Sequence, residues 1–161
     1  MFISTKVFDG FSTVFRQWKA KDTHCRFLHG YGVSFKVWFE GELDHRNWVW
    51  DFGGMKRAKT KIDGKSPKEW MDYMFDHTVI IAEDDPLLSE FKRFDNLPNL
   101  GNNNKGGIQL RIIPATGAEK FAEYIYNKLN NFVKTETNNR VKITQVEFRE
   151  HGKNSAIYSE K

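Results

Sequence analysis

The sequence predicts an α+β protein with an antiparallel sheet that carries helices on one face. Segments that alternate in polarity gather towards both ends of the 161-residue chain, and helical spacing dominates its middle. The apolar share of 39% is enough to build one hydrophobic core at this length. No repeat or long linker divides the chain, so we expect a single domain over residues 1–161, with the order β-β-α-α-β-β.

The N-terminal part predicts two strands. In residues 11–15, Phe, Thr and Phe share one face of an extended segment. Residues 33–39 then alternate strictly between apolar and polar, which is typical of a half-buried strand. The same alternation, extended backwards, places His29 and Tyr31 on the apolar face. Residues 48–52 (WVWDF) form a further short extended candidate.

Helix start signals follow in the middle of the chain. Residues 66–69 (SPKE) combine a capping box with proline at the first helical position, so a helix is expected to begin there. Asp85 and Pro86 open a second, short helix, in which we expect Leu87, Leu88 and Phe91 to face the core.

The strongest helical pattern comes after Pro114. Thr116 and Glu119 have the spacing of a second capping box at its start. Seven apolar residues then recur at positions i, i+3, i+4 and i+7: Ala118, Phe121, Ala122, Ile125, Leu129, Phe132 and Val133.

The C-terminal part predicts two more strands. Residues 141–143 and 146–148 alternate in opposite phases, which indicates a β-bulge near residues 144–145. Residues 151–154 (HGKN) predict a turn, and residues 155–159 the returning strand.

Several polar residues have the chemistry of a functional site. Cys25 stands among polar and basic neighbours, so we interpret it as a loop thiol rather than a small core residue. His29 and Tyr31 share a strand face. This spacing fits two metal ligands, and it fits equally a packed histidine and a packed tyrosine. The adjacent Asp76 and His77 suit a carboxylate that fixes the tautomer of an imidazole, provided that the fold brings them together.

Glu150 continues the apolar phase of the last long strand. A carboxylate on such a face needs a partner, often a ligand. In the alternative interpretation, the strand ends at Phe148 and Glu150 is solvated.

Charge and composition limit the class of partner. The net charge of +4 and the basic residues between 56 and 68 suit either a solvated helix face or an anionic phosphate ligand. One cysteine excludes an intrachain disulfide and a multi-cysteine zinc finger. Without a membrane-length apolar run, a signal-type segment or a nucleic-acid-binding motif, we expect a cytoplasmic protein that binds neither membrane nor nucleic acid.

Six short motifs occur in an informative order: FSTVF at 11–15, CRFLHGY at 25–31, VWDFGGMK at 49–56, FDH at 75–77, ATGAEKFA at 115–122 and FREHGKNSAIY at 148–158. Together they resemble the 6-pyruvoyl-tetrahydropterin synthase family, which includes the 6-carboxytetrahydropterin synthases of the bacterial queuosine pathway. The resemblance covers most of the chain. It implies the tunnelling fold, a ββααββ unit whose sheets join into a homo-oligomeric barrel, a trimer or hexamer with active sites between subunits.

The resemblance also implies an activity and its residues. The reaction would be that of a lyase on the C6 side chain of 7,8-dihydroneopterin triphosphate or a related pterin, with the basic segment suiting the triphosphate. Cys25 matches the catalytic base, and Asp76 and His77 match the pair that assists it. Glu150 matches the carboxylate that binds the guanidine-like edge of the pterin. Two further residues, Thr116 and Glu119, match the lining of the pterin pocket.

Finally, the resemblance implies a zinc ion held by three histidines, and no organic cofactor. Only His29 matches one of these ligands, because Phe15 and Tyr31 stand at the other two positions. Three alternatives follow: another residue such as His24 replaces a ligand, the reaction proceeds without metal, or the activity differs. A second interpretation of the whole chain is therefore a zinc-free, non-catalytic pterin- or purine-binding protein on the same fold.

Overall fold

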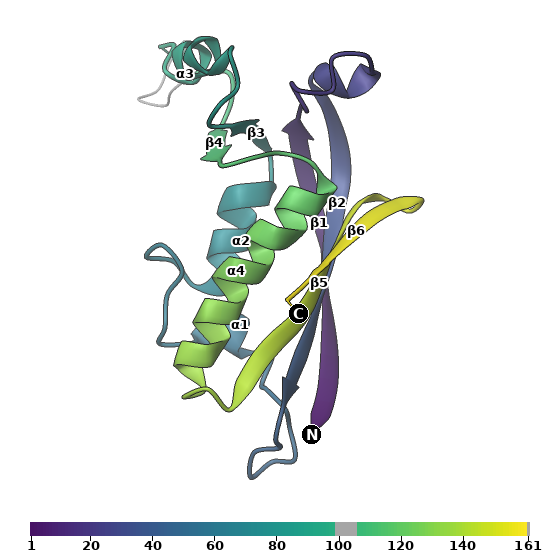
Figure 1. The fold of residues 1–161 in the computed structure, drawn as a ribbon. Coiled ribbons are helices and arrows are strands. Elements are labelled where there is room, and N and C mark those ends of the chain that lie inside the picture. The colour runs from purple at the N-terminus through teal and green to yellow at the C-terminus, as the bar shows by residue number, and fades with distance from the viewer. Residues whose placement is uncertain (99–105, 161) are drawn as a thin grey trace.

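Six strands form a single sheet in the order β4-β3-β1-β2-β5-β6, in a computed structural model that describes residues 1–98 and 106–160 (Figure 1). Four of the strands pair antiparallel, as predicted: β1 (Phe2–Phe15), β2 (His29–Gly41), β5 (Val141–His151) and β6 (Asn154–Ser159). Two short strands, β3 (Thr78–Ala82) and β4 (Leu110–Ile113), extend the sheet in parallel with β1. The sequence pattern predicts neither strand, because short strands in parallel pairing are continuous apolar runs without alternation.

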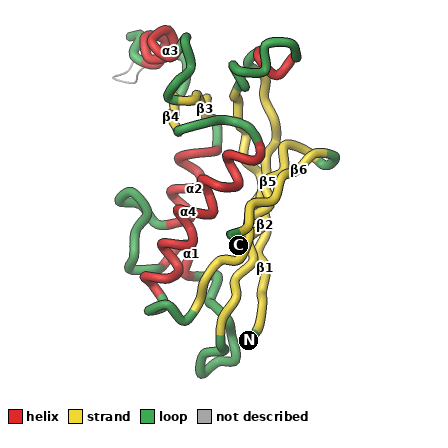
Figure 2. The backbone as a smooth tube through the Cα atoms, in the orientation of Figure 1, coloured by secondary structure: helices red, strands yellow, loops and turns green. Residues whose placement is uncertain are grey.

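The two main helices, α2 (Pro67–Phe75) and α4 (Ala118–Glu136), cover one face of the sheet (Figures 1 and 2). Three shorter elements complete the described fold: the 3-10 turn η1 (His24–Arg26), α1 (Gly54–Arg57) and α3 (Leu88–Asp95). Within residues 1–98 and 106–160, no helix is long and apolar enough to cross a membrane. The α+β class is thus confirmed, with a mixed rather than a wholly antiparallel sheet.

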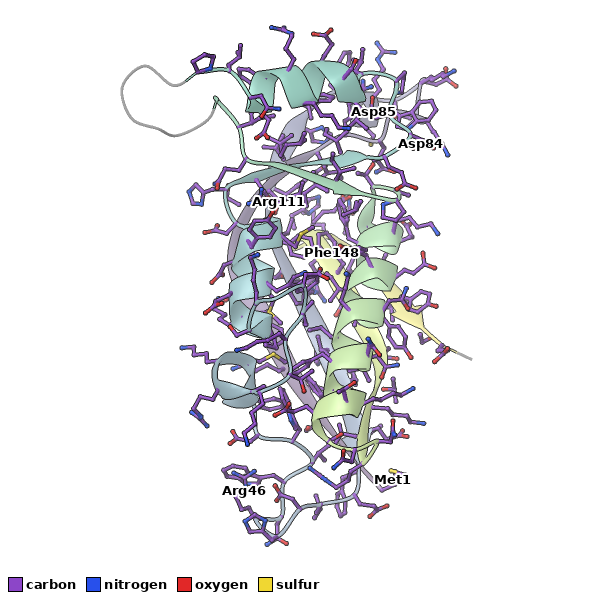
Figure 3. All side chains as sticks on the ribbon, turned by 90° about the vertical axis from the view of Figure 1, so that its left-hand side faces the viewer. Met1, Arg46, Asp84, Asp85, Arg111 and Phe148 are labelled. Carbon is purple, nitrogen blue, oxygen red and sulfur yellow. The ribbon has the colours of Figure 1, made fainter. Side chains whose placement is uncertain are left out.

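Aromatic rings fill the space between the sheet and the helices. Phe75 of α2 lies 5.8 Å from Phe35, 6.3 Å from Phe121 and 6.1 Å from Phe148, measured between ring centroids. Figure 3 shows Phe148 between the helices and the sheet. Each of these side chains is fully buried, and burial of one Phe stabilises the fold by roughly 1.5–3 kcal/mol.

Bulges adjust which side chains face this core. The bulge predicted near residues 144–145 is confirmed, because Trp38 pairs with Gln145 and Phe39 with Ile143, which leaves Thr144 as the extra residue. It lets the apolar residues on both sides of Thr144 point inward despite their opposite phases.

The helix starts agree with the sequence in one case and differ in the other. The predicted capping box of α2 is present: the Glu69 N–H donates to Ser66 Oγ at 3.2 Å, and the Ser66 N–H donates to Glu69 Oε2 at 3.4 Å. The predicted box at α4 is wrong. Gly117, with φ +115°, is the N-cap, and the Thr116 hydroxyl instead donates to the Arg16 carbonyl at 2.6 Å.

Two further expectations are wrong. Residues 48–52 form no strand, since the Asp44 carboxylate takes the Trp48 N–H at 3.1 Å and Arg140 donates to the Val49 carbonyl at 2.8 Å. These bonds replace a strand ladder. Helix α3 exists, but none of its residues is buried and the preceding Leu87 is 46% exposed. It lies at one end of the molecule, beyond the layer formed by α2 and α4 (Figure 1).

Candidate active site

The turn that carries Cys25 is held against the end of β1. The Gln17 N–H donates to the Cys25 carbonyl at 2.7 Å, and the Cys25 N–H donates to Thr23 Oγ1 at 3.2 Å. One nitrogen of Arg16 donates to the Arg26 carbonyl at 3.3 Å. The Cys25 residue is half-buried in this turn, so its thiol lies on a supported loop, as the sequence predicted.

An ion pair underlies this turn. Arg16 Nε donates to Asp85 Oδ2 at 2.8 Å, and Arg16 Nη2 donates to Asp85 Oδ1 at 2.5 Å. The Asp85 side chain is 0% exposed and the Arg16 side chain 15%. Hydrogen bonding to Asp85 raises the pKa of Arg16, so the guanidinium stays charged. Figure 3 places Asp85 at the end of the molecule where α3 lies.

His29 and Tyr31 form a hydrogen-bonded pair at the start of β2. His29 Nδ1 lies 2.7 Å from the Phe27 carbonyl, and His29 Nε2 lies 2.6 Å from the Tyr31 hydroxyl. A carbonyl only accepts, so Nδ1 carries the ring proton of neutral His29 and Nε2 accepts from Tyr31. Burial, then the Glu150 carboxylate and Cys25, raise the pKa of Tyr31, which keeps the phenol protonated.

Phe15 closes the inner side of this pair. Its ring centroid lies 5.3 Å from that of Tyr31 and 6.4 Å from that of His29. On the other side it packs edge-on against Phe121 at 4.8 Å, and Phe15 is only 1% exposed. The position at which the resemblance implies a histidine ligand is therefore occupied by an aromatic core residue, Phe15.

Glu150 lies at a bulge of the β5–β6 hairpin. Arg149 pairs with Ser155 and His151 with Asn154, so Glu150 is the extra residue. The strand continues beyond Phe148, and Glu150 is half-buried. Within residues 1–98 and 106–160, its carboxylate has no hydrogen-bond or ion-pair partner. The His151 ring lies 6.0 Å from that of Tyr31.

Asp76 and His77 do contact each other, with Asp76 Oδ1 3.0 Å from His77 Nδ1. The Ser12 N–H donates to Asp76 Oδ1 at 3.2 Å, and the His77 N–H donates to the Ser12 carbonyl at 2.7 Å. These bonds place the pair on the edge of β1 that faces β3. Ser12 and Gln17, which contact the pair and Cys25 respectively, are about 16 Å apart along the chain at ~3.3 Å per residue. The described part of the chain does not join the pair to Cys25.

The remaining candidates are dispersed. Glu119 is exposed in the first turn of α4. In the basic segment, Arg57 pairs with Asp51 at 3.3 Å and Lys68 with Asp72 at 2.9 Å. Figure 1 shows α1, whose last two residues begin this segment, towards the end of the sheet opposite the Cys25 turn.

A zinc ion does not fit the residues present. Phe15 has no donor atom, and both nitrogens of His29 are engaged, by the Phe27 carbonyl and the Tyr31 hydroxyl. His24 is exposed in the 3-10 turn. In the described ranges, no three His, Cys, Asp or Glu residues lie together as a metal site. A protein zinc site needs about three such ligands.

The sequence does not predict the roles of three residues of the site. Arg16 carries no signal beyond its place next to Phe15, and the pattern around His151 predicts only a turn. Asp85 was interpreted as a helix cap, and it does accept the Leu87 N–H at 2.8 Å. Its ion pair with Arg16 spans 69 residues, and no local pattern reports such a contact.

The fold and the site together define a tunnelling-fold α+β protein in which a His29–Tyr31 pair contacts Phe27, at the end of the Cys25 turn, and lies beside His151, the neighbour of Glu150. The sequence model of the 6-pyruvoyl tetrahydropterin synthase family matches residues 4–161, and the chain belongs to this family.

Solved structures agree with this fold. An uncharacterized protein from Wolinella succinogenes is 24% identical, with a TM-score of 0.72, over 99% of this chain and 98% of that chain. The 6-pyruvoyl tetrahydropterin synthase of Caenorhabditis elegans is 20% identical, with a TM-score of 0.58, over 99% and 96%. The Plasmodium vivax enzyme is 16% identical, with a TM-score of 0.59, over 99% of both chains. A comparison with curated proteins finds no match.

Proposed function

We propose that this protein is a lyase acting on the C6 side chain of 7,8-dihydroneopterin triphosphate or a closely related dihydropterin. The observation that carries the proposal is the Glu150 carboxylate, half-buried at a bulge and without a partner in the described chain. A carboxylate presents two acceptor oxygens, which match the paired N–H donors on the guanidine-like edge of a pterin. Family membership supports this ligand class.

Cys25 is the proposed base. The Cys25 thiol lies on a supported, half-buried turn, from which it would reach a bound ligand, and a cysteine acts as a base in its thiolate form. The thiolate would abstract a proton from a carbon of the C6 side chain, and proton return would complete the rearrangement or cleavage of that side chain. Asp76 and His77 are the proposed assisting pair, with the carboxylate orienting the imidazole.

A complete site in this proposal requires more than one subunit. Asp76 and His77 lie on the edge of β1 away from the Cys25 turn, so we propose that the pair acts on a site that a neighbouring copy provides. The sheet also ends in two edge strands that expose Ile112 on β4 and Ile157 on β6. Closing such edges in a homo-oligomeric barrel removes unpaired backbone groups. We expect a trimer or hexamer in sedimentation at micromolar concentration, and a monomer would contradict this.

A second candidate is a non-catalytic pterin- or purine-binding protein. It is favoured by Phe15 and by the mutual bond of His29 and Tyr31, which leave no histidine set for the metal expected in the family. Retention of Cys25 with Asp76 and His77 favours the enzyme, because a binding protein has no need for proton-transfer groups.

The test is incubation of the pure protein with 7,8-dihydroneopterin triphosphate and identification of products by mass. We expect a side-chain-shortened or rearranged pterin, and no product with Cys25→Ala. Binding without product would support the second candidate, and absence of pterin binding would contradict both.

Binding of the ring is tested by Glu150→Gln, with Glu119→Gln as the matched control. The amide that replaces the carboxylate carries no charge and would place an NH₂ group against the N–H donors of the pterin edge. Glu150→Gln should therefore bind pterin at least tenfold more weakly than the parent protein. Exposed Glu119 should tolerate the same change. Equal losses in both variants would show that Glu150 is not the anchor.

A further inference from the structure

We infer that the Tyr31 hydroxyl, positioned by His29, accepts a hydrogen bond from a hydroxyl of the ligand's C6 side chain, and that this recognition needs no metal ion. The inference rests on the proposed function and adds to it a residue that selects the side chain.

The hydrogen bonds around His29 determine the direction of the Tyr31 O–H bond. The Phe27 carbonyl oxygen lies 2.7 Å from His29 Nδ1, and because it can only accept, the proton of the neutral ring is on Nδ1. Nε2 therefore accepts a hydrogen bond from the Tyr31 hydroxyl, whose oxygen lies 2.6 Å away. The single phenolic proton of Tyr31 is therefore donated in the hydrogen bond to His29. The lone pairs of the Tyr31 oxygen remain, and they accept a hydrogen bond from an outside donor such as an alcohol.

The surroundings of Tyr31 place this acceptor between the two ends of the site. The Tyr31 ring lies 6.0 Å from the ring of His151, the residue that follows Glu150. Its partner His29 is hydrogen-bonded to the carbonyl of Phe27, which ends the turn that carries Cys25. For a pterin whose ring edge binds Glu150 and whose reacting carbon lies near Cys25, Tyr31 is therefore the side chain that we infer to meet the C6 substituent. In a dihydroxylated C6 side chain, the alcohol groups are the donors that suit this oxygen.

Packing holds the phenol in this place. Phe15 lies 5.3 Å behind Tyr31, the His29 ring 5.0 Å to one side and the His151 ring 6.0 Å away, all measured between centroids. Phe15 itself is wedged against Phe121. A ring enclosed in this way loses little further conformational freedom when it binds a ligand, which favours selective recognition.

The test compares two ligands that differ only in the recognised groups: 7,8-dihydroneopterin, and 6-methyl-7,8-dihydropterin, which has no side-chain hydroxyl. Affinities are measured by fluorescence titration on protein treated with a chelator, with zinc content checked by elemental analysis. We expect the parent protein to prefer dihydroneopterin by about five- to tenfold, the usual size of one hydrogen bond. Tyr31→Phe should remove this preference and leave the affinity for the methyl compound unchanged.

Two further variants separate recognition from fold. Tyr73→Phe, which removes a hydroxyl from a 44% exposed tyrosine on α2, should keep the full preference. His29→Gln retains an oxygen that accepts from Tyr31 and should keep more of the preference than His29→Leu, as expected for a positioning residue.

The outcomes are distinguishable. Equal affinities in the parent protein, or a preference that survives Tyr31→Phe, would overturn the inference and leave the proposed function intact. A preference that disappears with chelation and returns with added zinc would also overturn it. If neither compound binds, the proposed function itself fails, and the inference with it.

Discussion

The most demanding test of the structure is the substitution Asp85→Asn. The Asp85 carboxylate is fully buried, takes two bonds from Arg16 at 2.8 and 2.5 Å, and accepts the Leu87 N–H. The amide is nearly isosteric but neutral, and it leaves the guanidinium uncompensated. Breaking a buried ion pair on one side costs about 3–5 kcal/mol, which is the loss of unfolding free energy we expect from urea titration.

The control is an exposed pair in α3. Glu90 and Arg93 are joined at 3.2 Å with side chains 63% and 67% exposed, so Glu90→Gln should cost less than about 1 kcal/mol. The double variant Asp85→Leu with Arg16→Met removes both charges and should recover most of the stability lost in Asp85→Asn. A loss in Asp85→Asn no larger than in Glu90→Gln would refute the assignment of a buried, stabilising pair.

Three smaller predictions concern single positions. Ser66→Ala removes the acceptor for the first turn of α2 and should cost about 1 kcal/mol in urea unfolding. Gly117→Ala forces a Cβ onto φ +115°, 3.0 Å from Gln17 Oε1, and should cost about 1–2 kcal/mol, whereas Gly152→Ala, with open space around it, should be neutral. Burial, then Glu160, raises the pKa of Tyr126 from 10.0 to about 12. Its contribution to stability is therefore complete below pH 10 and lost towards pH 12, on the order of 2 kcal/mol. Tyr126→Phe should flatten the pH dependence in that interval; an unchanged slope would contradict the shift.

The sequence predicted elements whose patterns are local. Period-two alternation predicted β2, β5 with its bulge at Thr144, and the last five residues of β1, because one face of these strands is buried against helices. The turn at residues 151–154 predicted the returning strand β6. The capping box located the start of α2 to the residue. The parallel pair β3 and β4 carries no such period. The start of α4 depends on a left-handed Gly117 and on a bond from Thr116 to a residue 100 positions earlier.

In the candidate site, too, the sequence predicted features that depend on local pattern and not those that depend on distant contacts. Alternation predicted His29 and Tyr31 on the apolar face of their strand, and both are half-buried in phase with buried Val33. Glu150 is half-buried at its bulge. Their mutual arrangement was not predictable, because the bond between His29 and Tyr31 depends on side-chain rotation and the support of Cys25 depends on distant chain segments. The contact of Asp76 with His77 required a backbone φ of +56° at His77, a conformation that sequence adjacency does not imply.

The bulge at Glu150 makes the last hairpin unequally tolerant of changes in length. The turn at Gly152 and Lys153 is exposed, so residues inserted there lengthen a loop and leave the pairing of β5 with β2 as it is. One residue inserted between Phe148 and Glu150 instead reverses the alternation at the end of β5 and turns the carboxylate to the opposite face. Loop grafts and fusion tags are therefore compatible with the tip of this hairpin, whereas the two residues before Glu150 admit neither insertion nor deletion without loss of the proposed pterin anchor.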